Sequence, residues 1–461
     1  MSIIPAGPYR TLTTVEGDTF PYYIVPFDAN GNCEGPLTQQ HLMAHAANHS
    51  DIFVFSHGWN NDWSTATQRY ESFIKGFQAQ RRSLNLPMPA GYKPLLVGVF
   101  WPSQALEWFD SETGPGFAAG GDPAEQDAAV EASRRMLNDI ATRLAAENRS
   151  RFFTLAQAER LSGSEAREFA SLLLSTGEAS ADDDAGPSAS VTESDMLASA
   201  AAFGEPEPDY DAVHGFSPQQ GAPSASAGSL PQAALGLGDV LQALDPRQIL
   251  KPFTVWQMKN RAGKVGGRGV AALLEGLRRQ SKARIHLLGH SFGCKVVMTA
   301  VCSLPEDLGA DDGQPPVTSA VLLQPAVSQY AFAPRVPGRE PAVAGGFVKA
   351  LQRVQRPIVT TFSDHDVALT KLFHLALRRQ SDLGEDLNIA AGGPPSKYAA
   401  LGGYGPQDSG AAITDILDPG QAYDFGSARL VGVRGTRTIS GHGDISNAST
   451  WWLAYAVAAS A

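Results

Sequence analysis

Residues 289–293 read GHSFG and stand between an apolar run at 284–288 and a helix-forming segment that begins at Cys294. A serine between glycines at a strand-to-helix turn is typical of a nucleophile elbow. The turn holds the serine in an unfavourable backbone conformation, and small flanking residues let neighbouring backbone pass close by. Chance alone supplies about 0.3 such patterns in a chain of this length and glycine content. Support for an elbow therefore comes from the strand and helix expected on either side of the motif, and it makes the hydroxyl of Ser291 the candidate nucleophile.

Further runs typical of buried parallel strands lie on both sides of this motif. Residues 52–55 and 95–100 are continuous apolar runs, and the segment 64–82 between them has a helical pattern. Other strands are expected at 22–27, 317–323, 358–362 and 429–433, and other helices at 37–48, 342–353, 366–379 and 450–459. Strands that alternate with helices indicate an α/β fold with a mostly parallel sheet and helices on both faces.

The alternation is interrupted between residues 104 and 250, which we interpret as an insertion into a single domain spanning 1–461. Helical patterns in the insertion occur at 123–147 and 154–174, where we expect a cap over the site. From 176 to 235 the chain is rich in Ser, Ala, Gly, Pro and acids, a composition that predicts disorder. A second irregular, glycine-rich stretch at 380–426 is expected to lie near the site and to help select the substrate.

The net charge of -11 comes from the insertion. Residues 168–246 hold 13 of the 47 acidic residues and no lysine or arginine, so the remainder is nearly neutral, with 36 basic and 34 acidic residues. The chain has no basic patch interleaved with aromatic residues, which argues against nucleic-acid binding. Because disordered acidic segments often bind proteins, recruitment of a protein partner through the insertion is a second hypothesis.

Neither a membrane span nor an export signal is evident. No apolar stretch approaches the ~18 residues that a transmembrane helix needs. The first residues, MSIIP, lack a basic segment followed by a long apolar one. Three cysteines cannot form a disulfide framework, so a reducing, cytoplasmic location is expected. Export by a route without a cleaved signal is left open.

A serine hydroxyl needs a base, and the base needs a group that orients it. At a nucleophile elbow the acid and then the histidine follow the serine along the chain. His442 lies in a glycine-containing loop after the last expected strand and is the candidate base, whereas His374 falls inside a helical run. Asp366, after the strand 358–362, is the candidate acid, and Asp364 is the alternative. The position of Asp366 also suits a helix N-cap, a role compatible with that of the acid.

An oxyanion hole needs a second backbone donor besides the N–H of Phe292, which begins the helix after the elbow. Residues 56–62, SHGWNND, directly follow the strand 52–55. Their glycine lets the chain turn sharply over the nucleophile, so the N–H of Trp59 is the candidate second donor. The alternative interpretation is a turn with a packing tryptophan.

Together these motifs resemble those of the α/β-hydrolase superfamily. HGWN at 57–60, WPS at 101–103, the elbow, SDHD at 363–366 and His442 are most similar to a group of poorly characterised microbial serine hydrolases with the same His-Gly-Trp-Asn and Trp-Pro-Ser signatures. The resemblance covers about 20–103 and 250–461 and does not extend to the acidic insertion. It implies an acyl-transfer site carried by Ser291, Asp366 and His442, and it says little about the substrate.

The first hypothesis is therefore a hydrolase of carboxylic esters that acts through an acyl-enzyme on a small-molecule or lipid-like substrate. Thioesters and amides stay open as alternatives, and no cofactor is expected. His41, His45 and His49 are spaced to share a helix face, but no acidic or cysteine ligand completes a set, so no metal is expected. The competing hypothesis is a binding module on a hydrolase scaffold, which an intact set of candidate residues argues against.

Overall fold

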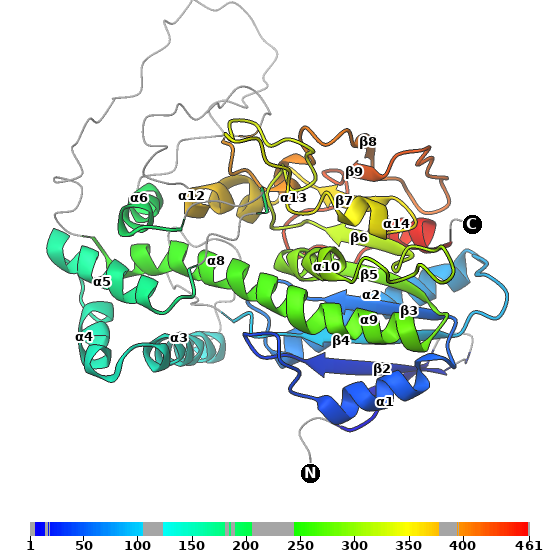
Figure 1. Ribbon diagram of the computed structural model, residues 1–461, viewed down its shortest axis with the longest axis horizontal. Helices are drawn as coiled ribbons and strands as arrows, with labels where there is room; N and C mark the ends of the chain where they lie inside the picture. The colour runs from blue at the N-terminus through cyan, green and yellow to red at the C-terminus, as the bar shows by residue number, and fades with distance from the viewer. Residues whose placement is uncertain are drawn as a thin grey trace, which may run out of the picture.

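A nine-stranded sheet crosses the molecule (Figure 1), with the strand order β1-β2-β4-β3-β5-β6-β7-β9-β8. The computed structural model describes residues 5–13, 17, 19–104, 123–179, 184–185, 190–204, 244–377, 394 and 396–459. The strands are β1 (Arg10–Thr13), β2 (Thr19–Pro26), β3 (Asp51–Ser56), β4 (Pro94–Phe100), β5 (Arg284–His290), β6 (Ser319–Leu323), β7 (Ile358–Phe362), β8 (Ala412–Asp415) and β9 (Leu430–Arg434). Among the described strands, β1 and β2 form the one antiparallel pair, so the chain is of the α/β class with a mostly parallel sheet.

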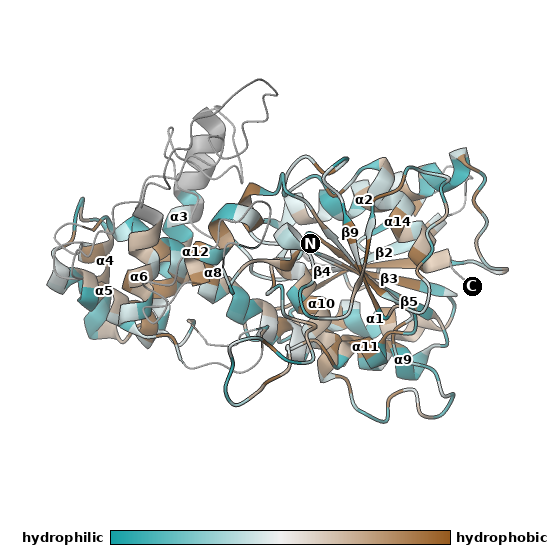
Figure 2. Ribbon diagram, turned by 90° about the horizontal axis from the view of Figure 1, so that it is seen from above, coloured by the Kyte–Doolittle hydropathy of each residue, from teal (hydrophilic) through white to brown (hydrophobic). Residues whose placement is uncertain are grey.

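Helices cover both faces of this sheet (Figure 2). One face carries α2 (Trp63–Ser83) and α14 (Ala448–Ala459), and the other carries α1 (Pro36–Ala46), α9 (Ala271–Gln280), α10 (Phe292–Ser303) and α11 (Ala350–Arg353). Side chains of β3 alternate between the two cores: Ile52 and Val54 join one cluster, and Phe53 and Phe55 join the other. Because the strand is apolar on both faces, it reads as a continuous apolar run.

The two central strands bring the segments of the candidate site together. β3 and β5 are parallel neighbours, with Ser56 opposite Gly289 in the register. The loop after β3 and the elbow after β5 therefore leave the sheet side by side, at the edge formed by the carboxyl ends of the strands. Ligands bind at this edge in open α/β sheets.

A separate helical lobe lies beside the sheet (Figure 1). Its helices are α3 (Pro123–Arg143), α4 (Ala146–Ala156), α5 (Gly163–Ser175) and α6 (Glu193–Gly204). The helix α8 (Pro246–Lys264) joins lobe and body, because Phe253 packs in the lobe cluster and Met258 in the core of the sheet. The helical pattern expected at 154–174 covers the end of α4 and most of α5. A capping box at Ser162 marks the start of α5.

The described part of the insertion is more ordered than its composition predicts. Within 176–235, residues 190–204 include helix α6, and Met196 and Leu197 are buried in the lobe cluster. This contradicts the expectation of disorder for that part, because the apolar face of α6 is buried against α5 and α8. Residues 180–183, 186–189 and 205–235 lie outside the described residues, so the expectation stays a prediction for them.

Two acidic residues of the insertion, Asp184 and Glu178, are buried and pair with cations of the interior. The carboxylate of Asp184 is buried between the ammonium groups of Lys259 on α8 and Lys295 on α10. It also accepts a hydrogen bond from the N–H of Ser328 at 3.3 Å. Glu178 is buried too and accepts from Arg261 Nε at 2.9 Å. These contacts tie the insertion to the helix that follows the elbow.

Two other expectations are corrected. The helix expected at 342–353 is present only as α11, because a Cβ at Gly345 would lie 2.2 Å from the carbonyl oxygen of Tyr330, and the chain there packs as an irregular loop. The stretch 380–426, expected to be irregular, contains the short helix α13 (Leu401–Tyr404) and the edge strand β8. Its residues 380–393 lie outside the described residues.

None of the described helices combines the length and the apolar character that a bilayer span requires. Within the described residues, which include all three cysteines, each cysteine is a free thiol. Burial raises the pKa of Cys294 well above its ordinary value and that of Cys302 to about 11. Both thiols are therefore protonated and poor nucleophiles near neutral pH.

Candidate active site

Ser291 forms the tip of a sharp turn between β5 and α10. Its backbone has φ 55° and ψ -125°, a conformation that residues other than glycine rarely adopt. The turn packs closely against the loop after β3: a Cβ at Gly293 would lie 2.1 Å from the carbonyl oxygen of Ser56, and one at Gly58 would lie 2.6 Å from Ser291 Cβ. Glycine at 293 and 58 is therefore required by space, and the hydroxyl is held at the carboxyl edge of the sheet.

One chain of hydrogen bonds joins the three predicted side chains. His442 Nε2 lies 2.9 Å from Ser291 Oγ, and His442 Nδ1 lies 2.8 Å from Asp366 Oδ2. Ser291 and Asp366 are buried, while the side chain of His442 is 11% exposed. An imidazole held in this way has one nitrogen facing the hydroxyl and the other facing the carboxylate, so it is placed to accept the serine proton.

The geometry also separates the two candidate acids. Asp366 Oδ1 accepts a hydrogen bond from the N–H of Leu369 at 3.1 Å, so this carboxylate caps a helical turn while it contacts His442. Asp364 is exposed, and its N–H donates to Thr436 Oγ1 at 3.3 Å. The structure therefore brings Asp366, and not Asp364, to His442.

The HGWN and WPS segments brace each other beside Ser291. The ring of His57 stacks on that of Trp101, with ring centres 5.5 Å apart, and Trp101 Nε1 donates to the His57 carbonyl at 3.0 Å. Burial lowers the pKa of His57 to about 4, so the ring is neutral near pH 7, and its Nε2 accepts from the N–H of Trp101 at 3.3 Å. Ser103 completes the contact, since its carbonyl accepts from the N–H of Asn60 at 2.8 Å.

This bracing orients the peptide unit that joins Gly58 to Trp59. The Gly58 carbonyl accepts from Asn61 Nδ2 at 3.1 Å, and the Trp59 carbonyl accepts from the same group at 2.7 Å. Because a peptide unit is planar and trans, holding the Gly58 carbonyl on one side turns the N–H of Trp59 to the other. Phe292 is the first residue of α10, where no intrahelical acceptor exists for its N–H. The rings of Trp59 and Phe292 meet edge to face with centres 6.0 Å apart, so the two predicted donors belong to neighbouring residues.

Two further residues hold the triad and escaped the sequence analysis. Gln324, directly after β6, donates from Nε2 to Asp366 Oδ2 at 2.8 Å and to the Gly441 carbonyl at 3.0 Å. Burial lowers the pKa of His290 well below its ordinary value, so the ring is neutral, and Nε2 donates to the His442 carbonyl at 2.8 Å. The available signal for Gln324 was a polar residue placed directly after an apolar strand, at the carboxyl edge of the sheet.

If the site catalyses acyl transfer, Gln324→Leu is expected to lower kcat by about 10- to 100-fold with little change in KM, because His442 and Asp366 would lose the amide that aligns their loops. Steady-state kinetics on a neutral ester measure this. The matched control is Gln329→Leu, which removes another buried amide, bonded to the Ser396 carbonyl at 3.0 Å, from the same connection. A kcat that falls equally in both variants would contradict the positioning role.

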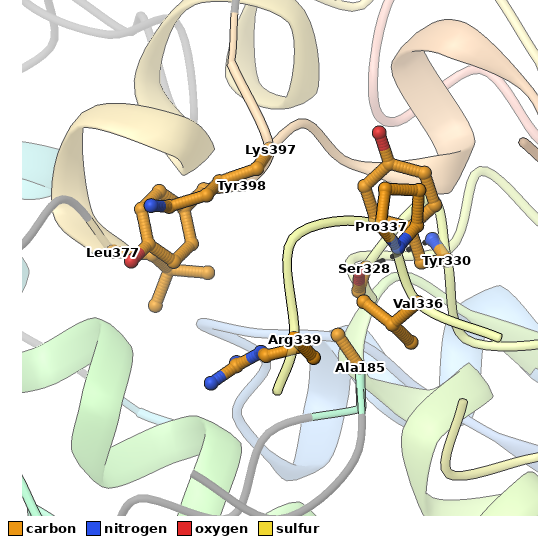
Figure 3. A pocket seen from close by; sticks show the side chains of 9 residues that line it. All are labelled: Ala185, Ser328, Tyr330, Val336, Pro337, Arg339, Leu377, Lys397 and Tyr398. Carbon is orange, nitrogen blue, oxygen red and sulfur yellow. Dashed lines mark hydrogen bonds between the residues drawn. The ribbon is translucent and has the colours of Figure 1, made fainter. Parts of the chain in front are cut away.

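Other candidate sites from the sequence are not assembled around Ser291. The rings of His41 and His45 stack with centres 4.0 Å apart, and His41 Nδ1 lies 3.0 Å from the hydroxyl of Tyr23. Across the described ranges, no group of three or more metal-ligating side chains is found. A small pocket lies between the loop after β6 and the segment before α13 (Figure 3), with Tyr330 and Tyr398 among its lining residues. Its lining includes no member of the triad.

The site thus consists of a hydroxyl, an imidazole and a carboxylate in one hydrogen-bonded chain, with the loop that carries Trp59 packed against the turn of Ser291. Comparisons of the chain with protein-family models, with curated proteins and with solved structures gave no match. The chemistry of the site is therefore inferred from its own geometry.

Proposed function

We propose that this chain is a serine hydrolase of the α/β-hydrolase fold that cleaves carboxylic esters or related acyl bonds. The observation that carries the proposal is the continuous contact from Ser291 Oγ through His442 to Asp366, at 2.9 and 2.8 Å. Support also comes from the strained backbone of Ser291 at the end of a central parallel strand, which is the setting of a nucleophile elbow.

In the proposed mechanism, Ser291 Oγ bonds to the acyl carbon while its proton passes to His442 Nε2. Asp366 keeps the imidazole oriented and stabilises its positive charge. The carbonyl oxygen becomes negative, and the N–H groups of Trp59 and Phe292 donate hydrogen bonds to it. The bond to the alcohol then breaks as His442 returns the proton to the leaving oxygen. Water attacks the acyl-enzyme in the same way and releases the acid.

Aromatic side chains and the helical lobe supply a substrate-binding wall in this proposal. The ring of Phe292 contacts those of Trp59 and Phe373, with centres 6.0 and 6.3 Å apart. Trp59 packs against both the core of the sheet and the lobe cluster. In this proposal an apolar acyl or alcohol group would lie against Trp59, which is half-buried, and this favours a small-molecule or lipid-like acyl substrate.

A fluorophosphonate probe is expected to label the protein at Ser291, because its phosphorus mimics the acyl carbon and the activated hydroxyl attacks it. Mass spectrometry of the labelled peptide identifies the modified residue, and Ser291→Ala serves as the unlabelled control. A panel of esters, thioesters and amides, assayed with the same preparation, defines the acyl bond that is cleaved. A folded protein that neither reacts with the probe nor cleaves any member of the panel would sink the proposal.

A further inference from the structure

The side chain of Arg69, on α2, has no countercharge among the residues that the structure describes. Within the described residues its guanidinium makes no hydrogen bond or ion pair, and Nη1 is buried. Burial of this group lowers its pKa. Elsewhere the interior pairs its cations, as Arg261 with Glu178 and Lys295 with Asp184. Arg69 as a whole is half-buried, but its Nη1 is shielded from solvent and has no hydrogen-bond partner among the described residues, and this arrangement favours an anion supplied from outside the chain.

The guanidinium lies next to the proposed site. A Cβ built on Gly443, an exposed residue directly after His442, would lie 3.8 Å from Arg69 Nη2. The pKa of His290 and that of His57 are lowered chiefly by burial, and the positive charge of Arg69 lowers both further. His290 precedes the nucleophile and His57 begins the loop that carries Trp59. Arg69 is therefore close to three segments that surround Ser291.

Carboxylates of the same region are engaged by other groups. Asp444, two residues after His442, accepts from the N–H and hydroxyl of Ser440 and from Asn447 Nδ2. Glu71, two residues after Arg69 on α2, pairs with Arg10 and Lys75. These two carboxylates are thus satisfied without Arg69, and within the described part of the chain its donors remain available to a ligand.

We propose that Arg69 binds a carboxylate carried by the substrate, on either its acyl or its alcohol part. This inference rests on the proposed function, because it places the carboxylate beside an ester bond held at Ser291. A guanidinium is suited to this task, since its planar fork donates two parallel hydrogen bonds to a carboxylate. The substrate class is then an ester with a free carboxylate near the cleaved bond.

Matched esters test the assignment. The first set places the charge on the acyl part: it consists of 4-nitrophenyl half-esters of four- to six-carbon dicarboxylic acids, each compared with the neutral compound in which the free carboxylate is a methyl ester. The second set places the charge on the alcohol part: 3-acetoxybenzoate is compared with its methyl ester. The wild-type protein is expected to prefer at least one carboxylate ester over its neutral partner. In Arg69→Gln, kcat/KM for that ester is expected to fall about 10- to 100-fold while the neutral partner stays within about threefold.

Two variants sharpen the readout. Arg69→Lys keeps the charge and loses the fork, so an intermediate preference is expected. Lys75→Gln removes a positive charge from the same helix and should keep the full preference, since Lys75 is exposed and pairs with Glu71.

An equal loss on charged and neutral esters in Arg69→Gln, or a wild-type protein with no carboxylate preference, would overturn the assignment. If Ser291 reacts with the fluorophosphonate probe and neutral esters are cleaved, such a result removes only the role of Arg69. If neither labelling nor cleavage of any ester is seen, the proposed function itself fails, and the role of Arg69 falls with it.

Discussion

Replacement of Ser291 by alanine is expected to lower kcat for ester hydrolysis by about 10⁴- to 10⁶-fold. The variant loses the hydroxyl that lies 2.9 Å from His442 Nε2. His442→Ala should cost a similar factor, and the double variant should be little worse than either single one, because the two groups act as one unit in the same step. Kinetics of the three variants on one neutral ester, with wild-type protein assayed in parallel, measure both the size of the loss and its non-additivity.

The control for this series is Ser319→Ala. Ser319 is a buried serine and the first residue of β6, and its hydroxyl lies 2.8 Å from His286 Nδ1. Its removal should leave kcat near that of the wild-type protein. A Ser291→Ala protein that kept more than about one-hundredth of the wild-type kcat, after exclusion of wild-type carry-over, would show that the hydroxyl is not the nucleophile. Thermal unfolding of each variant separates loss of chemistry from loss of fold.

Asp184→Asn is expected to lower the free energy of unfolding by about 3–5 kcal/mol, because it removes the charge that faces two buried ammonium groups. The carboxylate contacts Lys259 Nζ at 3.3 Å and Lys295 Nζ more closely still. Burial alone would raise the pKa of Asp184, but the two lysines and the Ser328 N–H lower it below the ordinary 3.8. Urea unfolding at pH 7 measures the difference between variant and wild-type protein.

The pH dependence of this difference has a definite sign. Since the folded-state pKa of Asp184 is below 3.8, the stabilisation by its carboxylate is fully present above that value and is lost as the pH falls through the folded-state pKa. The advantage of the wild-type protein over Asp184→Asn should therefore shrink only in acid. Glu168→Gln is the control, because it removes a carboxylate from an exposed pair with Arg151 and should change stability far less. Equal effects of the two substitutions would contradict the buried tie.

The same contact bears on the insertion as a separable docking segment. Deletion of 176–235 would remove Asp184 as well as α6, so it would disturb the interior next to the elbow helix. The single substitution Asp184→Asn therefore tests the structural role of this contact, which the deletion would not separate from the loss of α6.

Much of the sheet and the core of the site could be predicted from sequence because their signals are local. The strands β3, β4 and β5 are apolar on both faces, and each reads as a short continuous run. The elbow needs glycine at 293 because the backbone of Ser56 lies close to it. Such a turn is therefore visible in the sequence as a motif of five residues, 289–293. The order of Asp366 and His442 after the serine follows from the order of the parallel strands that carry them.

Other features depend on segments that meet only when the chain is folded. Gln324 reaches the carbonyl of Gly441, which is 117 residues away, and Asp184 reaches Lys295 across 111 residues. The composition of 176–235 predicts disorder, yet Asp184 is buried because Lys295, from a distant segment, neutralises its charge. Which of Asp364 and Asp366 faces His442 likewise depends on how the folded chain places the two loops.

Local pattern was therefore sufficient for the strands, the elbow and the chain order of the candidate triad, because backbone sterics and burial act over a few neighbouring residues. Three features could be recognised only in three dimensions: the contact of Gln324 with Asp366, the bracing of the HGWN loop by Trp101, and the lack of a partner for Arg69 Nη1 among the described residues. Hydrogen bonds and charges act over a few ångströms of space, and the distance between two residues along the chain does not determine whether packing brings them that close.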